Sequence, residues 1–122
     1  MPGAPPPRAG LPRAERLRSR AEFDRLFRRG ARVEGPAFVL LWRREPGPRA
    51  VGFAAGRRLG GSVVRNRARR RLREAYRRQR SLLPREGIRL CFIARQGTLT
   101  SRFDQLEDAI AGALRQAARR PG

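Results

Sequence analysis

Apolar residues recur at helical spacing through the middle of the chain. Four of them follow one another every fourth residue, with a fifth beside them: Val64, Ala68, Leu72, Tyr76 and Ala75. In an α-helix this spacing places the side chains on one narrow face, which can lie against a core. The pattern predicts a helix that begins at Ser62, as its N-cap, continues to about Leu83 and ends at Pro84.

A second amphipathic segment lies near the N-terminus. Ser19 and Glu22 have the spacing of a capping box, so we expect a helix that runs to about Arg29. Gly30 follows and is expected to end the helix as a left-handed cap. The side chains that should face inward are Phe23, Leu26 and Phe27.

A third helix is expected to open at Thr100 or Ser101. Its apolar face is formed by Phe103, Leu106, Ile110, Leu114 and Ala117. Its first turns also carry three acids: Asp104, Glu107 and Asp108. Clustered carboxylates can hold a metal ion, but acids near a helix start also complement the positive end of the helix dipole, and we favour this second interpretation.

Three segments have the composition of β-strands. Pro36–Trp42 and Ile88–Ala94 are apolar runs bounded by glycine or by charged turns. Arg49–Ala55 is expected to form a hairpin with Pro36–Trp42, although Gly52 weakens it. The order helix, two or three strands, helix, strand, helix predicts one α+β domain with a small sheet.

The predicted domain covers residues 16–120. Residues 1–15 are rich in proline and basic in charge, and they are expected to form a disordered extension. Within the domain, the glycine-rich segment Gly56–Ser62 should bring Arg57 and Arg58 close to phosphate groups.

The charge of the chain indicates a polyanionic partner. Thirty basic residues face ten acidic ones, which gives a formal net charge of +20. All thirty are arginine, whose planar fork suits phosphate. We favour GC-rich codon usage as the reason for the missing lysine, and the two explanations are compatible, but codon usage does not explain the excess of positive charge. Arg65, Arg69, Arg73 and Arg77 lie one helical turn apart, and like charges at that spacing destabilise an isolated helix unless an external anion matches them. The central helix is therefore predicted to bind nucleic acid.

Several kinds of chemistry are disfavoured by the residue types present. Histidine is absent and Cys91 is the only cysteine, so an internal disulfide, a Cys-His zinc site and histidine acid–base catalysis are excluded. Cys91 lies in an apolar run and is expected to be a buried, unreactive thiol. No catalytic residue, protein-bound metal or small-molecule substrate is expected. No apolar run has the length of a membrane span and no signal-peptide pattern is seen, so we expect a cytoplasmic protein without membrane contact.

Several motifs together resemble one family. They are Arg65-Asn66-Arg67 followed by arginines at 69, 70 and 73, Phe23 and Phe27 before Gly30, Phe38-Val39-Leu40, the Gly52–Gly60 segment, and Ile93-Ala94-Arg95. A basic helix alone is common, but these motifs in this order and spacing resemble the protein component of bacterial ribonuclease P, over about residues 16–119.

The resemblance implies an αβββαβα fold of the ribosomal protein S5 domain 2-like type, with a left-handed βαβ crossover. It also implies a subunit of a ribonucleoprotein endonuclease whose RNA, with Mg²⁺, removes the 5′ leader of precursor tRNA. The partners implied are one ribonuclease P RNA per protein and precursor tRNA, and the protein itself holds no cofactor.

The resemblance also assigns the binding residues. The RNA-binding set is Arg65, Asn66, Arg67, Arg69, Arg70 and Arg73, to which the loop adds Arg57 and Arg58. The leader-binding cleft is assigned to Phe23, Phe27, Val39 and Leu41.

Two positions depart from the family pattern. Leu41 stands where relatives commonly have tyrosine, and strand alternation sends the following Trp42 to the opposite face. The segment Phe53-Ala54-Ala55-Gly56 lacks the serine of relatives, so hydroxyl contacts are not carried over.

Three other functions share parts of this sequence pattern. A ribosomal or nucleoid protein that binds by charge would share the composition but needs no cleft. A protein-only nuclease would need clustered acids or a histidine, and arginine is not an ordinary general base. A membrane-surface helix is disfavoured because the apolar stripe is too narrow.

Overall fold

The computed structural model describes residues 16, 17 and 19–119. Its elements, in chain order, are α1 (Arg20–Arg29), β1 (Ala31–Glu34), β2 (Phe38–Pro48), β3 (Ala50–Ala54), the 3₁₀ turn η2 (Arg57–Leu59), α2 (Ser62–Gln79), the 3₁₀ turn η3 (Arg80–Leu82), β4 (Glu86–Ala94), α3 (Gln96–Thr100) and α4 (Phe103–Arg119). This confirms an α+β domain with a single small sheet. The predicted extension 1–15 and the last residues, 120–122, lie outside the described residues.

The four strands form one mixed sheet in the order β1-β2-β4-β3. β2 pairs antiparallel with β1 and with β4, whereas β3 pairs parallel with β4. The predicted hairpin between Pro36–Trp42 and Arg49–Ala55 is therefore wrong, because β4 lies between them. The apolar sequence of β4 explains its place: a strand that is buried on both faces is most stable at the centre of a sheet.

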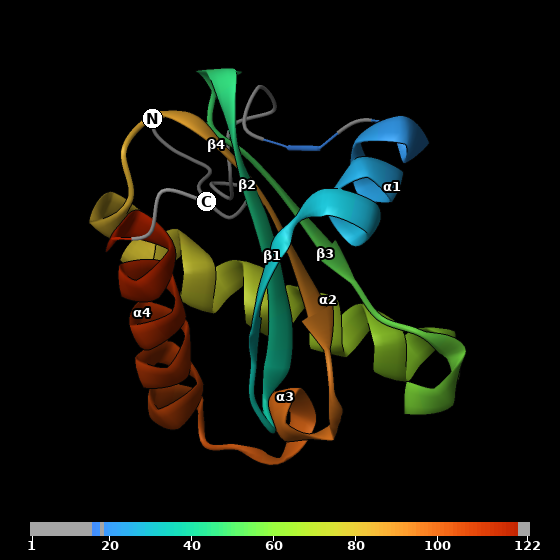
Figure 1. Ribbon diagram of the computed structural model, residues 1–122. Helices are drawn as coiled ribbons and strands as arrows, with labels where there is room; N and C mark the ends of the chain where they lie inside the picture. The colour runs from blue at the N-terminus through green and yellow to red at the C-terminus, as the bar shows by residue number, and fades with distance from the viewer. Residues whose placement is uncertain (1–15, 18, 120–122) are drawn as a thin grey trace, which may run out of the picture.

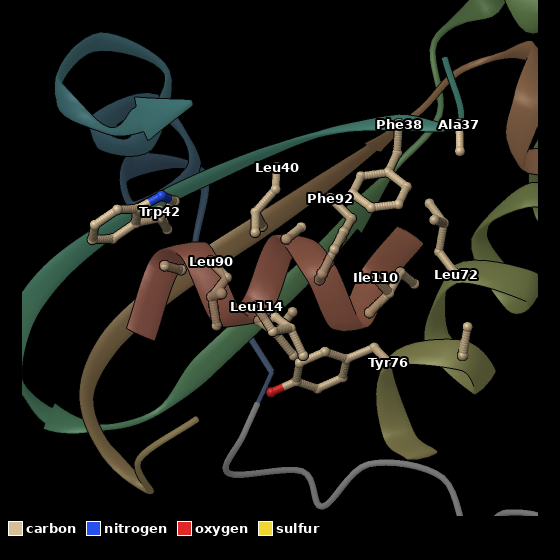
Figure 2. Packing of buried hydrophobic residues seen from close by; sticks show 14 of the residues in the cluster. Ala37, Phe38, Leu40, Trp42, Leu72, Tyr76, Leu90, Phe92, Ile110 and Leu114 are labelled. Atoms are coloured by element: carbon tan, nitrogen blue, oxygen red, sulfur yellow. The ribbon is translucent and has the colours of Figure 1, made fainter. Parts of the chain in front are cut away.

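Helices cover both faces of the sheet (Figure 1). Phe38, Leu40 and Trp42 of β2 point into the large core beneath α2 and α4, together with Leu90 and Phe92 of β4 (Figure 2). The alternate residues of the same strands lie in a smaller cluster beneath α1: Val39, Leu41 and Cys91, with Leu26 of the helix. The predicted separation of Leu41 and Trp42 onto opposite faces is confirmed.

The helix α2 connects β3 to β4 and forms the crossover between two parallel strands (Figure 1). Four of the five residues of its predicted apolar face are buried, Ala68, Leu72, Ala75 and Tyr76, and the fifth, Val64, is partly buried. Tyr76 packs against Phe92 with ring centroids 5.8 Å apart. The helix is thus fixed to the sheet by one side.

Three features of the helix ends differ from the predictions. The α-helical part of α2 ends at Gln79 instead of about Leu83, and the 3₁₀ turn η3 follows it to Leu82. The N-cap of α2 is Gly61, and Ser62 is the first helical residue. Gly30 does not have a left-handed backbone, since its φ is −76°. A glycine is needed there for space, because a Cβ at Gly30 would lie 2.6 Å from the carbonyl oxygen of Leu26. The N-cap of α1 is confirmed, with the Ser19 side chain accepting from the Glu22 N–H at 3.2 Å.

The C-terminal helix also begins later than predicted. The short helix α3 occupies Gln96–Thr100, and α4 starts at Phe103 instead of Thr100 or Ser101. Its first-turn Asp104 accepts from Arg102 at 2.9 Å, and Glu107 lies 3.3 Å from Arg78 of α2. These acids are engaged with neighbouring arginines.

Candidate nucleic-acid interface

The outward side of α2 carries most of the predicted RNA-binding residues. Asn66, Arg67 and Arg70 are exposed and the others are partly exposed. We call this set the α2 arginine face: Arg65, Asn66, Arg67, Arg69, Arg70 and Arg73. Because the opposite side of the helix is buried in the core, these side chains project from a rigid support.

Part of this face is hollowed. A depression of about 420 Å³ is lined by Asn66, Arg69, Arg70 and Arg73. The Asn66 side-chain oxygen accepts a hydrogen bond from Arg69, which orients that guanidinium. The pKa of Arg73 is lowered, first by burial and then by the neighbouring positive charges of Arg16, Arg69 and Arg70. Positive charges held together in this way are stabilised by an anion between them.

Residues 62–73 of α2 contain no acid. The first acid of the helix is Glu74, whose carboxylate lies 2.6 Å from Arg77 and 3.2 Å from Arg78. The hydrogen bond from Arg77 is the main reason that the pKa of Glu74 is lowered. Arg77, the last member of the predicted arginine ladder, is therefore already neutralised within the protein.

Arg71 belongs to the same run of arginines but has a different role. Its Nε donates to the carbonyl of Thr98 at 2.8 Å, and its Nη2 donates to the carbonyl of Ser101 at 2.5 Å. The same guanidinium lies 5.7 Å from the ring centroid of Phe103. Arg71 therefore joins α2 to the segment between α3 and α4.

The glycine-rich loop is positioned as predicted, directly before α2. Arg57 and Arg58 lie in the turn η2 and are exposed. Arg58 also lines a second hollow of about 550 Å³, together with Leu59, Ile93 and Arg95. This hollow combines an apolar floor with guanidinium groups, a composition that suits an unpaired nucleotide.

The four residues predicted for the leader cleft lie on the α1 side of the sheet but differ in access. Phe27 is 50% exposed, so the prediction that its side chain faces inward is wrong, and Phe23 is partly exposed. Val39 and Leu41 are 4% and 0% exposed, so they form the floor beneath α1 instead of an open surface. Phe23 and Ile93 are partly exposed and pack against the cluster beneath α1, whereas Phe27, on the same helix as Phe23, is the more exposed ring.

Gly52 has a role on this side that the sequence did not reveal. A Cβ at Gly52 would lie 2.8 Å from the Cζ atom of Phe23 and 2.9 Å from the Cδ1 atom of Leu17. Gly52 weakens β3 as a strand, but its lack of a side chain allows the ring of Phe23 to pack against the sheet. In the sequence, the sign of this role is that Gly52 interrupts the apolar residues of that strand.

The one cysteine of the sequence lies in the central strand of the sheet. Cys91 is buried, and burial raises the pKa of its thiol to about 12, far from that of a nucleophile. Within the described part of the chain, no group of three or more His, Cys, Asp or Glu residues lies close enough to hold a metal ion. None of the described helices has the length and apolar character needed to cross a membrane.

The family model and the curated relatives that match this chain belong to the same family. The family model described as Ribonuclease P matches residues 11–118. The ribonuclease P protein component of Gluconacetobacter diazotrophicus is 42% identical over 112 residues, which cover 90% of this chain and 93% of that protein. The corresponding protein of Symbiobacterium thermophilum is 43% identical over 104 residues, covering 82% and 88%.

Solved structures of the same family share the fold. The ribonuclease P protein of Thermotoga maritima superposes with a TM-score of 0.73 at 26% identity, over 84% of this chain and 96% of that one. The protein of Staphylococcus aureus gives a TM-score of 0.71 at 25% identity, over 86% and 96%. The match extends over the whole α2 arginine face and the sheet that supports it, and the chain belongs to the family of ribonuclease P protein components.

Proposed function

We propose that this chain is the protein subunit of ribonuclease P, which removes the 5′ leader of precursor tRNA, and that its α2 arginine face binds the RNA subunit. The observation that carries this assignment is the acid-free hollow lined by Asn66, Arg69, Arg70 and Arg73. Guanidinium forks match the geometry of phosphate oxygens, and a rigid helix can hold several of them against a folded RNA.

The contribution to catalysis would be electrostatic. Folded RNA concentrates negative charge, which Mg²⁺ ions otherwise have to neutralise. The arginines of α2 neutralise phosphates from the protein side, so the RNA subunit should reach its active arrangement at a lower Mg²⁺ concentration. Mg²⁺ itself would be held by RNA oxygens, the hard ligands that this ion prefers.

The α1 side would contact the leader of precursor tRNA. Phe27 presents an exposed ring, and base stacking on such a ring is worth about 1–3 kcal/mol per base without demanding a sequence. Arg57 and Arg58 lie at the start of α2 and would bind the phosphates of the same strand. Leu41 supports this surface from beneath, since it is fully buried.

Reconstitution with ribonuclease P RNA tests the proposal. Cleavage of precursor tRNA is measured at low Mg²⁺ with RNA alone and with RNA plus protein, and we expect activity only with the protein present. Affinities for precursor and mature tRNA are then compared, with the leader-bearing RNA expected to bind more tightly. Equal binding of both tRNAs, without any gain in cleavage, would indicate a protein that binds nucleic acid by charge alone.

A further inference from the structure

Arg16 precedes α1 and lies against the edge of the sheet. It forms a parallel bridge with Val51 of β3, and the N–H of Leu17 donates to the carbonyl of Val51 at 3.0 Å. Successive residues of an extended chain face opposite sides of a sheet. Leu17 packs in the cluster beneath α1, so Arg16 points to the other side, where Val51 joins the core beneath α2.

Arg73 reaches the same region from α2. Its guanidinium carbon lies 5.6 Å from the ring centroid of Phe53, and Phe53 follows Val51 by two residues on β3, on the same face. Arg16, opposite Val51, and Arg73, over Phe53, therefore lie against neighbouring positions on the same face of β3, and Arg73 also lines the α2 hollow. In agreement with this arrangement, burial and then the positive charges of Arg16, Arg69 and Arg70 lower the pKa of Arg73. Two segments distant in sequence thus bring arginines to one place.

We infer that Arg16 is a further RNA-binding residue, which forms a single site for RNA phosphate groups together with Arg69, Arg70 and Arg73. The inference rests on the proposed function of the α2 arginine face and adds a residue from outside that helix. Two of the four guanidinium groups are restrained, Arg69 by Asn66 and Arg73 by the ring of Phe53, and the backbone of Arg16 is held by its bridge to β3. Restrained donors lose little entropy when an anion binds.

The site would also join the two RNA-binding sides of the protein. Arg16 faces α2, and the next residue, Leu17, packs beside Gly52 on the α1 side. An RNA strand that passes from the α2 arginine face towards α1 around the β3 edge therefore meets Arg16 at the boundary. Loss of Arg16 should weaken RNA binding without disturbing either side.

The test measures the affinity of the full chain for ribonuclease P RNA over a series of salt concentrations. The variants are Arg16→Ala, Arg73→Ala, the double variant and Arg115→Ala. The last is the matched control, since Arg115 is exposed on α4 and its removal changes the net charge equally. Arg16→Ala should weaken binding by about 3- to 10-fold and reduce the salt slope by about 0.7–0.9.

The double variant shows whether the two arginines share phosphates. If they do, its loss of affinity is smaller than the product of the two single losses. The inference is overturned if Arg16→Ala binds no more weakly than Arg115→Ala, or if the two single losses multiply. If Arg73→Ala itself has no effect, the proposed function of the α2 face fails as well.

Circular dichroism checks that each variant is folded. Should Arg16→Ala unfold, Arg16→Lys takes its place, because lysine keeps the charge but cannot bind phosphate with a planar fork. We then expect a loss of about 2- to 3-fold, with the salt slope nearly retained. Wild-type affinity for this variant would overturn the requirement for a guanidinium at position 16.

Discussion

The two ends of α2 use their arginines differently. Residues 62–73 hold no acid, and the hollow lies among their arginines. In residues 74–79, Glu74 pairs with Arg77 and Arg78, and Arg78 also pairs with Glu107 of α4. The first region leaves its positive charge to an external anion, whereas the second matches it within the protein. The presence or absence of acidic partners within the protein thus distinguishes the two regions.

The same distinction extends to arginines that donate to backbone carbonyls. Arg49 is 8% exposed, and its Nη1 lies within 3.3 Å of the carbonyl oxygens of Arg80, Leu83 and Pro84, which follow α2. Arg44 donates to the carbonyls of Ala117 and Ala118 at the end of α4, both at 3.0 Å. These side chains neutralise helix ends, where the free carbonyls carry partial negative charge.

Removing charge from the first region should give the largest effect on binding. The triple variant Arg67→Gln, Arg69→Gln, Arg70→Gln is expected to bind ribonuclease P RNA about 100-fold more weakly near 0.15 M salt, because about three phosphate contacts are lost. Its melting temperature should stay unchanged or rise, since repulsion along the helix is relieved. A control triple, Arg20→Gln, Arg28→Gln, Arg115→Gln, makes the same change of charge elsewhere. Equal losses of RNA affinity for both triple variants would mean that the α2 arginine face is not a specific RNA-binding surface.

The buried Arg49 should affect stability and not binding. Arg49→Met leaves carbonyls after α2 without their donor, and we expect a loss of about 2–3 kcal/mol in the free energy of unfolding. Denaturant titration measures this loss, with the exposed Arg85→Met as control. Folded Arg49→Met should still bind RNA with wild-type affinity; weak binding by the folded variant would contradict a purely structural role.

Adjacent residues of α2 provide a sharper comparison. Arg71→Gln removes the hydrogen bonds to Thr98 and Ser101, so the free energy of unfolding should fall by about 1–2 kcal/mol with little change in the salt slope. Arg70→Gln should do the reverse, reducing the salt slope by about 0.7–0.9 while stability is kept. If both variants change the same quantity, the division of roles along this run is wrong.

The smallest effect is expected at Glu74. Glu74→Gln should lower the free energy of unfolding by about 0.3–0.5 kcal/mol, as for exposed helical ion pairs. It also releases Arg77 and Arg78, so affinity for RNA should rise by about 2-fold, and the salt slope should steepen. A variant that binds RNA more weakly than the wild type would contradict the internal neutralisation of this region.

The pH dependence of stability gives a second measurement on Glu74. Its pKa is lowered in the folded state from the usual 4.5, so its ion pair stabilises the protein above pH 4.5. This contribution is lost as the pH falls through the lowered pKa. The difference in unfolding free energy between the wild type and Glu74→Gln should therefore shrink on acidification.

Helices were easier to predict from this sequence than strand pairing. The apolar repeats of α2 and α4 depend on neighbours three and four residues apart, and the buried face of each agreed with the pattern. The pairing of β3 depends on β4, which lies more than thirty residues along the chain from it, and so the local expectation of a hairpin with β2 was wrong. Arg49, between these strands, is buried and bonded to the turn after α2, which no local pattern indicates.

The candidate site was predictable in part. The run of arginines indicated the binding helix, but nothing in the spacing distinguished Arg71, which bonds to carbonyls 27 and 30 residues away. The contribution of Arg16 depends on a bridge to β3 that has no signature in the sequence. On the α1 side, the alternation along β2 predicted correctly that Val39 and Leu41 lie on one face. It did not predict that both side chains would be buried beneath α1.

The hydrogen bonds of the inward arginines also limit how the sequence can change over time. Each of Arg44 and Arg71 donates to two separate carbonyls, a geometry that suits a guanidinium fork and not the single ammonium of lysine. At an exposed arginine such as Arg67, lysine keeps the positive charge and loses only the planar fork, a smaller change than the loss of two hydrogen bonds to carbonyls within the protein. A lineage whose codon usage shifts towards AT should therefore acquire lysine first on the outer side of α2 and last at Arg44 and Arg71.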